Sequence, residues 1–166
     1  MIEYTVFNSP IGKINIAAVK EGVVKISFSN ESIEELDFWC QKHLGAGVRE
    51  GSEYTIAAEQ QILDYLDGKI QSLNFQIIHI NLPFRKKVLE AERKIPYGET
   101  RSYGEVAQMV NNSKACRAVG SANAKNPLPL YFPCHRIITS NGKLGGFGGG
   151  LNVKQFLLDL EDRNRL

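Results

Sequence analysis

The chain has 166 residues, of which 43% are hydrophobic and 9% aromatic, so it can bury one good core or two small ones and is too apolar to be disordered. No apolar run reaches the roughly 18 residues that a membrane span needs, and no basic leader precedes a hydrophobic stretch, so we expect a cytoplasmic protein. Three cysteines without regular spacing predict free thiols rather than a disulfide framework, and we expect neither metal nor cofactor.

The net charge of +2 is divided unevenly along the chain. Residues 1–80 carry 6 basic and 11 acidic side chains, whereas residues 81–166 carry 14 and 7. A basic half beside an acidic one indicates a polyanionic partner for the basic half, although a solvated basic surface would have the same composition.

Residues 1–80 predict an α+β domain that opens with an antiparallel meander. Three strands are expected, separated by turn residues, at residues 2–7, 13–19 and 23–28. A capping box of Ser32 and Glu35 begins a helix that stops at Gly45, and residues 55–66 predict a second helix. A last strand candidate at residues 75–80 completes the domain.

Residues 81–166 predict a second, mostly helical domain. Asn81 is placed to cap a helix that runs to Ile95. A capping box of Ser102 and Glu105 begins a short helix that ends near residue 110. After a three-residue turn, Ser113 caps a further helix through residue 124, which makes a helix-turn-helix.

The end of the chain predicts a wing and a final helix. The pair Asn141-Gly142 separates residues 137–139 from residues 143–147 and is typical of a type I′ hairpin. Asn152 is placed to cap a last helix over residues 153–162. The expected fold is therefore α+β, with an N-terminal antiparallel sheet and helices and a C-terminal winged helix-turn-helix domain.

Small residues dominate the second helix of the predicted helix-turn-helix, between Ala115 and Ala124. Its backbone can approach a partner closely, but it has few long polar side chains with which to read base edges. Packing against a neighbouring helix would explain the same small residues but leaves Arg117 unexplained.

Cys134 lies in the segment Phe132-Pro133-Cys134-His135-Arg136. A cysteine in an apolar run is more often an inert core residue than a nucleophile, and sequence neighbours in a strand point apart. Nearby prolines favour an irregular backbone, in which His135 reaches the sulfur directly or through a water. The residues alone therefore permit an activated thiol without requiring one.

The chain resembles the O6-alkylguanine-DNA alkyltransferases from Pro96 onward. The motifs that carry the resemblance are IPYGET (95–100), SYGEVA (102–107), RAVG (117–120), NPLP (126–129), PCHR (133–136) and GGL (149–151). The Pro-Cys-His-Arg motif is highly specific when it stands at this distance from the RAVG and NPLP motifs. Residues 81–166 are covered, and the N-terminal half is similar only in plan to the family's ribonuclease-H-like domain.

The resemblance implies a single-turnover repair reaction. Cys134 would take the alkyl group from an O6-alkylated guanine, and also from O4-alkylated thymine, flipped out of duplex DNA, and would keep it as a thioether. His135 would remove the thiol proton through a water, and Glu161 would orient the imidazole. Tyr103 would donate to the guanine ring and crowd the phosphate.

The resemblance also implies how DNA and the base are held by a monomer. Arg117 would fill the gap left by the flipped base, with its helix in the minor groove. The other expected DNA contacts are Tyr103, Ser113, Lys114, Ala118 and Lys125. Asn126 would tie the two helices of the helix-turn-helix together, while the carbonyls of Cys134 and Ile137 would accept from the guanine amino group.

Residues 145–151 would form a lid over the base, with Phe147, Gly148 and Gly149 lining the pocket. Many members have a serine at the position of Gly148 and a tyrosine at that of Phe147. Glycine there leaves only a backbone N–H for O6 and would widen the pocket toward bulkier alkyl groups.

Three other functions stay open on the sequence. In a non-catalytic, lesion-binding relative the cysteine is commonly replaced by tryptophan, which the presence of Cys134 disfavours. A turnover Cys-His-Glu hydrolase would need neither the basic half nor Arg117, and a winged-helix transcription factor would need longer base-reading side chains. Cys40 and His43, three apart on a predicted helix, lack a second ligand pair, and Cys116 is better explained as a packing residue.

Overall fold

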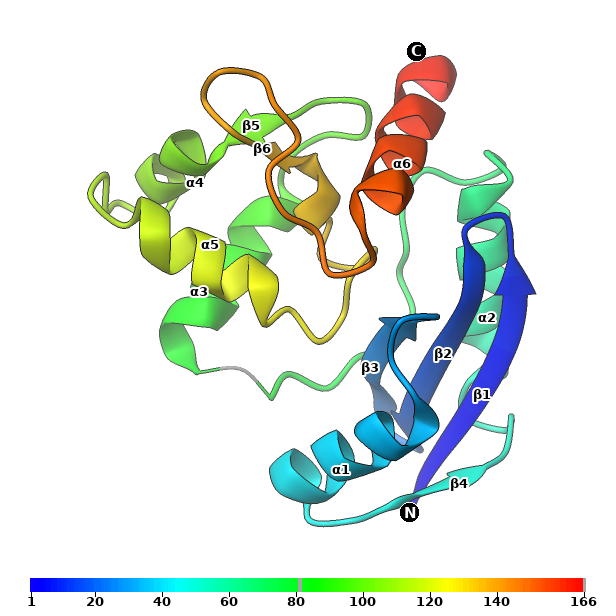
Figure 1. Ribbon diagram of the computed structural model, residues 1–166. Helices are drawn as coiled ribbons and strands as arrows, with labels where there is room; N and C mark the ends of the chain where they lie inside the picture. The colour runs from blue at the N-terminus through cyan, green and yellow to red at the C-terminus, as the bar shows by residue number, and fades with distance from the viewer. Residues whose placement is uncertain (81, 166) are drawn as a thin grey trace. The chain divides into compact units, whose positions relative to one another are not determined.

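The computed structural model describes residues 1–80 and 82–165, and the chain divides into two compact units, Met1–Ile80 and Asn81–Leu166 (Figure 1). Both units combine helices with short strands, so the expected α+β class is confirmed. Within the described residues, no helix is long and apolar enough to cross a membrane.

The first unit is built on a four-stranded sheet. The predicted meander is present as β1 (Ile2–Ser9), β2 (Gly12–Val19) and β3 (Gly22–Phe28), paired antiparallel. A fourth strand, β4 (Val48–Glu50), pairs parallel with β1 and gives the order β3-β2-β1-β4, so the sheet is mixed rather than purely antiparallel. Sequence analysis missed β4 because three residues carry no alternation signal.

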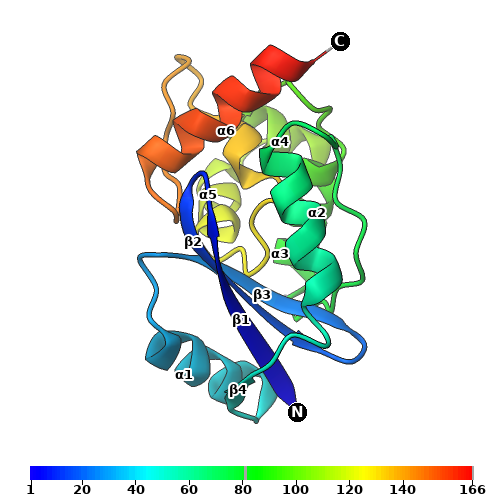
Figure 2. The ribbon, with the colours of Figure 1, turned by 90° about the vertical axis from the view of Figure 1, so that its right-hand side faces the viewer.

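Two helices lie on opposite sides of this sheet (Figure 2). α1 (Ile33–Leu44) has the predicted capping box at Ser32 and ends at Gly45, whose φ of +71° suits glycine. Leu36 and Cys40 of α1 pack against Ile2, Ala17 and Val24 of the sheet. α2 (Ile56–Leu66) follows the expected bounds within one residue.

The expected strand at residues 75–80 is wrong. This segment makes one isolated parallel bridge, between Val23 and Ile77, with Val23 N donating to Gln76 O and Ile78 N donating to Val23 O, each at 2.9 Å. A Cβ at Gly22 would stand 3.0 Å from the backbone of Gln76 and Ile77, so glycine permits this close approach.

The second unit is mainly helical. Its elements are α3 (Pro83–Arg93), β5 (Arg101–Ser102), α4 (Tyr103–Met109), α5 (Cys116–Ala124), the 3₁₀ turn η1 (Cys134–Arg136), β6 (Ile137–Ile138) and α6 (Leu151–Asn164). α4 and α5 form the helix-turn-helix, and with α3 they enclose a core that includes Val88, Val106, Val119 and Ile137.

Of the helix caps predicted at described residues of this unit, one is present and two are not. The Ser102–Glu105 capping box begins α4. Leu82 is the N-cap of α3 with Pro83 in the first turn, and the expected cap, Asn81, lies outside the described residues. The N-caps of α5 and α6 are Ala115 and Gly150, so the predictions of Ser113 and Asn152 as caps are wrong.

The predicted hairpin wing is also wrong. Thr139 N donates to Lys143 O at 2.9 Å and closes a turn, but residues 143–147 continue as an irregular loop. β6 pairs instead with β5, in parallel, with Arg101 opposite Ile137 and Ser102 opposite Ile138. The glycine-rich segment after Lys143 has weak strand propensity, whereas Ile137 is held by its burial in the core.

Candidate active site

Cys134 and His135 lie on a tight turn that directs their side chains differently from those of a strand. Cys134 N donates to Phe132 O at 2.7 Å, and Arg136 N donates to Pro133 O at 2.9 Å, which winds residues 134–136 into η1. Cys134 is 7% exposed and His135 is fully buried. The irregular backbone expected from the prolines is therefore a 3₁₀ turn.

The Cys134 thiol is neutral at rest. Burial raises the pKa of Cys134 to about 12 and the negative charge of Glu92 adds to the rise, while a hydrogen bond from Asn126 and the positive charge of Lys154 oppose it. Since the thiolate is the nucleophilic form, the site needs a base that removes this proton as the reaction begins.

A buried carboxylate on α6 fixes the orientation of the His135 imidazole. His135 Nε2 donates to Glu161 Oε2 at 2.7 Å, and Arg136 donates to both oxygens of the same carboxylate, from Nε at 2.8 Å and Nη2 at 2.9 Å. Gly98 N donates to Oε1 at 3.1 Å. Because a carboxylate only accepts, Nε2 carries the hydrogen, and Nδ1 is the basic nitrogen of the ring.

The charges of this cluster are set by burial and by mutual hydrogen bonds. Burial alone would raise the pKa of Glu161, but hydrogen bonds and charge interactions with His135 and Arg136 outweigh it and hold the pKa far below its usual range. Burial lowers the pKa of His135, and Glu161 opposes this effect. The resting pair is therefore a neutral imidazole beside a carboxylate that also pairs with Arg136.

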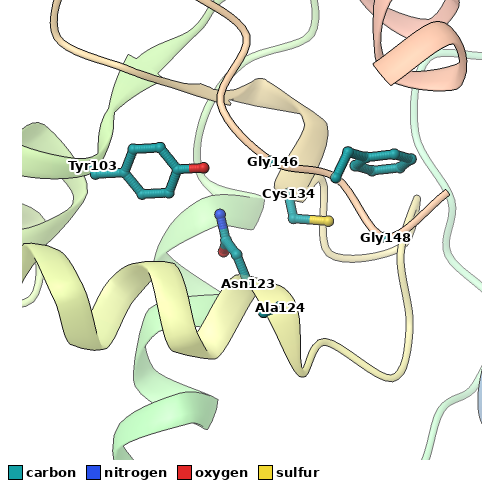
Figure 3. Close-up of a pocket in the computed structure, with 7 residues that line it drawn as sticks. Tyr103, Asn123, Ala124, Cys134, Gly146 and Gly148 are labelled. Atoms are coloured by element: carbon teal, nitrogen blue, oxygen red, sulfur yellow. The ribbon is translucent and has the colours of Figure 1, made fainter. Parts of the chain in front are cut away.

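The Cys134 side chain reaches a pocket of about 290 Å³, at the small end of the range for ligand sites. Its lining residues are Tyr103, Asn123, Ala124, Cys134, Gly146, Phe147 and Gly148. Figure 3 shows the Tyr103 hydroxyl and the Asn123 side chain directed toward the space beside Cys134. α4, α5, η1 and the loop before α6 therefore each contribute to one cavity.

The loop over this pocket is tied to α6 by a fully buried lysine. Lys154 Nζ donates to Ile137 O at 2.5 Å, to Leu144 O and to Gly146 O at 3.2 Å. Gly145 has a φ of +71°, and a Cβ there would stand 2.9 Å from the Tyr103 hydroxyl. The loop therefore passes close to Tyr103 in a conformation that suits glycine. The hydrogen bonds from Lys154 stabilise this conformation.

Both units match family models. Residues 83–163 match "6-O-methylguanine DNA methyltransferase, DNA binding domain", and residues 2–77 match "6-O-methylguanine DNA methyltransferase, ribonuclease-like domain". The chain belongs to this methyltransferase family. The resemblance inferred from the motifs is thereby confirmed.

Individual relatives agree over nearly the whole length. The methylated-DNA–protein-cysteine methyltransferase of Methanosarcina acetivorans is 41% identical over 160 residues, covering 95% of this chain and 97% of the relative. The constitutive Bacillus subtilis protein of the same name is 35% identical, covering 95% of this chain and 94% of its own. A crystal structure of Mycobacterium tuberculosis OGT in complex with DNA superposes with a TM-score of 0.84 at 33% identity, covering 98% and 94%.

DNA is a partner of this methyltransferase, and most of the residues expected to contact it are exposed on the helix-turn-helix. Ser113 and Lys114, in the turn, are exposed, as are Arg117, Ala118 and Lys125 on or just after α5. Val119 and Ala122 face the core instead. Tyr103, at the start of α4, is half-buried between this helix pair and the pocket.

One expected pocket residue and one expected bridge need correction. Gly149 is not among the residues that line the pocket, whereas Asn123, Ala124 and Gly146 line it as well. The side chain of Ile137 is in the core, and the contact expected from its backbone carbonyl stays a prediction. Asn126 Nδ2 donates to Phe132 O at 3.0 Å and its Oδ1 accepts from Leu128 N at 2.9 Å. Asn126 therefore closes the loop that leads to Cys134 and does not tie the two helices together.

Sequence reasoning missed two charged residues of the methyltransferase site, Lys154 and Glu92. Both are fully buried, Lys154 against the loop carbonyls and Glu92 on α3 against Asn123. Charged residues on an amphipathic helix are normally predicted to face solvent, and the residues that contact Lys154 and Glu92 are distant in sequence. In the sequence, Lys154 stands between Val153 and Gln155, and this position alone does not identify it as a buried residue.

Proposed function

We propose that this chain repairs DNA by moving the alkyl group of O6-alkylated guanine, and of O4-alkylated thymine, onto Cys134 Sγ in one irreversible turnover. Family membership gives the reaction class, alkyl transfer from DNA to a protein cysteine. The observation that supports this choice of residue is the position of Cys134, in the pocket and next to an imidazole oriented by Glu161.

The thiol proton leaves through His135. Glu161 fixes the tautomer in which Nδ1 is basic, so a water between Sγ and Nδ1 can pass the proton to the ring. The imidazolium that forms lies 2.7 Å from a carboxylate, which stabilises the new charge. The thiolate then attacks the alkyl carbon in line with the C–O6 bond; the S–C bond forms and the C–O6 bond breaks.

The electron pair of the broken bond stays on the guanine, where Tyr103 would stabilise it. Burial raises the pKa of Tyr103, while a hydrogen bond from the Gly146 backbone opposes the rise, so the hydroxyl stays protonated and can donate to the ring. The guanine regains a proton from this donor or from solvent. The thioether does not hydrolyse, so each molecule reacts once.

The exposed face of α5 supports the proposed DNA geometry. A helix of small residues can lie close against the minor groove, and Arg117 can enter the stack where the alkylated base has left it. Basic side chains at positions 114 and 125 would contact phosphates without reading sequence. We infer a monomer that acts in the cytoplasm on double-stranded DNA.

A transfer assay tests the stoichiometry. With excess duplex carrying labelled O6-methylguanine, label on the protein should rise to one methyl per molecule and stop, and Cys134→Ser should take none while binding undamaged duplex as before. Loss of label from the duplex that continues beyond one equivalent, with release of methanol, would indicate a turnover hydrolase instead.

A further inference from the structure

The segment that leads to Cys134 contains a strained residue, Leu130. It is buried, and its backbone φ of +74° lies in the left-handed region, which residues with a bulky side chain seldom adopt. Such a conformation persists only where the surrounding contacts hold it. Because Leu130 stands just before the turn that carries Cys134, the groups that hold this segment also help to fix the position of the thiol.

Asn126 provides one set of these contacts. Its side chain donates to Phe132 O at 3.0 Å and accepts from Leu128 N at 2.9 Å. Phe132 O also accepts from Cys134 N at 2.7 Å, so this carbonyl links the segment to η1. The preceding carbonyl, that of Tyr131, is bound by a side chain from a different element.

Arg93, the last residue of α3, makes two contacts with Tyr131. Arg93 Nη1 donates to Tyr131 O at 2.9 Å, and Arg93 Cζ lies 3.8 Å from the centroid of the Tyr131 ring. At this separation a guanidinium and an aromatic face attract one another. One side chain thus binds both the backbone and the ring of a single residue. The Tyr131 ring in turn meets the Phe132 ring edge to face, with centroids 5.0 Å apart.

α3 is a rigid support for these contacts. Val88 and Ala91 of this helix lie in the same buried core as Ile137 of β6, which follows directly after η1. The side chain of Arg93 itself is exposed, so it can be replaced without opening a cavity in that core. Its contacts with Tyr131 can therefore be removed while the core stays intact.

We propose that Arg93 is a positioning residue for alkyl transfer: by holding Tyr131 it keeps the segment before Cys134 in its strained conformation and so sets the place of Sγ in the pocket. The inference rests on the proposed function, since it takes Cys134 as the alkyl acceptor. Reacting atoms must approach to about 3–3.5 Å in line, and a misplacement of about 1 Å can slow a reaction about 100-fold. Arg93 acts through Tyr131 and takes no part in the bond changes.

The test follows methyl transfer from duplex O6-methylguanine in single-turnover reactions at increasing protein concentration, which separates the rate at saturation from the half-saturating concentration. Arg93→Met keeps the length of the side chain but removes both contacts, so the rate at saturation should fall about tenfold while the half-saturating concentration changes little. Arg93→Lys keeps a cation and one donor and should restore part of the rate. Lys94→Met, which removes the same charge from the next, exposed residue, should react as wild type does.

A second variant tests whether Arg93 acts through Tyr131. Tyr131→Leu removes the ring but keeps the carbonyl, so its combination with Arg93→Met should slow transfer by less than the product of the two single effects. Effects that multiply would place the role of Arg93 elsewhere and overturn the inference. If Arg93→Met does not fold, Arg93→Lys takes its place in the comparison.

Melting temperatures show that each variant is folded at the temperature of the assay. A variant that melts lower but transfers methyl at the wild-type rate would reduce Arg93 to a structural role. A change confined to the half-saturating concentration would place it in DNA binding. Either result would overturn the inference while the proposed function stands, whereas wild-type protein that takes no methyl would overturn both.

Discussion

Glu161 Oε2 lies 2.7 Å from His135 Nε2, and both side chains are almost completely buried. The same carboxylate accepts two hydrogen bonds from Arg136, whose Nη1 also donates to Ile95 O at 2.8 Å. α6, η1 and the segment that follows α3 are thus joined through Arg136 and this carboxylate, which orients the proposed base and also stabilises the second unit.

Glu161→Gln should impair both functions of this carboxylate. An amide no longer selects the tautomer with a basic Nδ1, so methyl transfer should slow by about 100-fold or more. Arg136 would keep a buried charge without its counter-ion, at a cost of about 3–5 kcal/mol in the free energy of unfolding. Quenched time courses measure the rate of methyl transfer, and denaturant-induced unfolding measures the free energy of unfolding.

Asp162→Asn is the matched control, because Asp162 is the next residue on α6 and its side chain is 70% exposed. It should change neither quantity. Equal losses in the two variants would mean that the charge of the helix end, and not the Glu161 contacts, is responsible.

The stability difference between wild type and Glu161→Gln should depend on pH. The folded-state pKa of Glu161 is lowered, so its contribution is fully present above the unfolded value near 4.5 and is lost as the pH falls toward the folded value. The gap between the two melting temperatures should therefore narrow below about pH 4.5. A gap that stays constant from pH 7 to 3 would contradict the lowered pKa.

Glu92→Gln should show the opposite dependence. The pKa of Glu92 is raised by burial, so its contribution is greatest at low pH and is lost as the pH rises from near 4.5 toward the folded value. Wild type should thus gain stability relative to Glu92→Gln as the pH falls through this window. A relative loss over the same window would show that Glu92 behaves as an ordinary ion pair.

Lys154→Met keeps the length of the side chain but removes the donor that holds Ile137, Leu144 and Gly146. Unmet buried carbonyls typically cost about 1–3 kcal/mol each, less where water reaches them, so the unfolding free energy should drop by about 2 kcal/mol or more. Limited proteolysis within residues 140–150 should accelerate. Gln155→Met, on the exposed side of the helix, is the control, and equal protection in both variants would show that the loop does not depend on Lys154.

Gly148→Ser tests whether the loop has spare room. Apart from the two chain neighbours of Gly148, no described residue has an atom within 4 Å of the position of a Cβ there, so the variant should fold with its stability changed by less than about 0.5 kcal/mol. Serine would offer a donor to O6 and occupy space, so methyl transfer should keep its rate or improve while benzyl transfer slows. A parallel change for both alkyl groups would count against a size limit at this position.

Local signals in the sequence were sufficient for much of the fold. The capping boxes at Ser32 and Ser102 placed α1 and α4 correctly, because both partners of the box are three residues apart. Single cap residues were less informative: the polar side chain of Asn152 lies inside α6, because Gly150, with a φ of +97°, ends the loop two residues earlier. The parallel pairing of β5 with β6 joins residues 36 apart and leaves no local pattern.

In the candidate site, too, some residues could be predicted from the sequence and others could not. Tyr103, Cys134 and His135 lie in the family's motifs, and Glu161 could be inferred from the resemblance; the structure brings the four together around one pocket and its adjoining turn. Lys154, Glu92 and Asn123 could not be predicted, because their place in the site depends on contacts between α3, α5, α6 and the loop. Burial of a charge is a tertiary property, and helical periodicity alone places lysine and glutamate on the surface.

Mass spectrometry of peptides from protein exposed to one equivalent of duplex containing O6-methylguanine identifies the residue that takes the methyl group. We expect one added methyl group per molecule, located on Cys134, with Cys40 in its buried core and exposed Cys116 unmodified. Methyl on Cys116 or Cys40, or no methyl on the protein while the lesion disappears from the DNA, would show that Cys134 is not the acceptor.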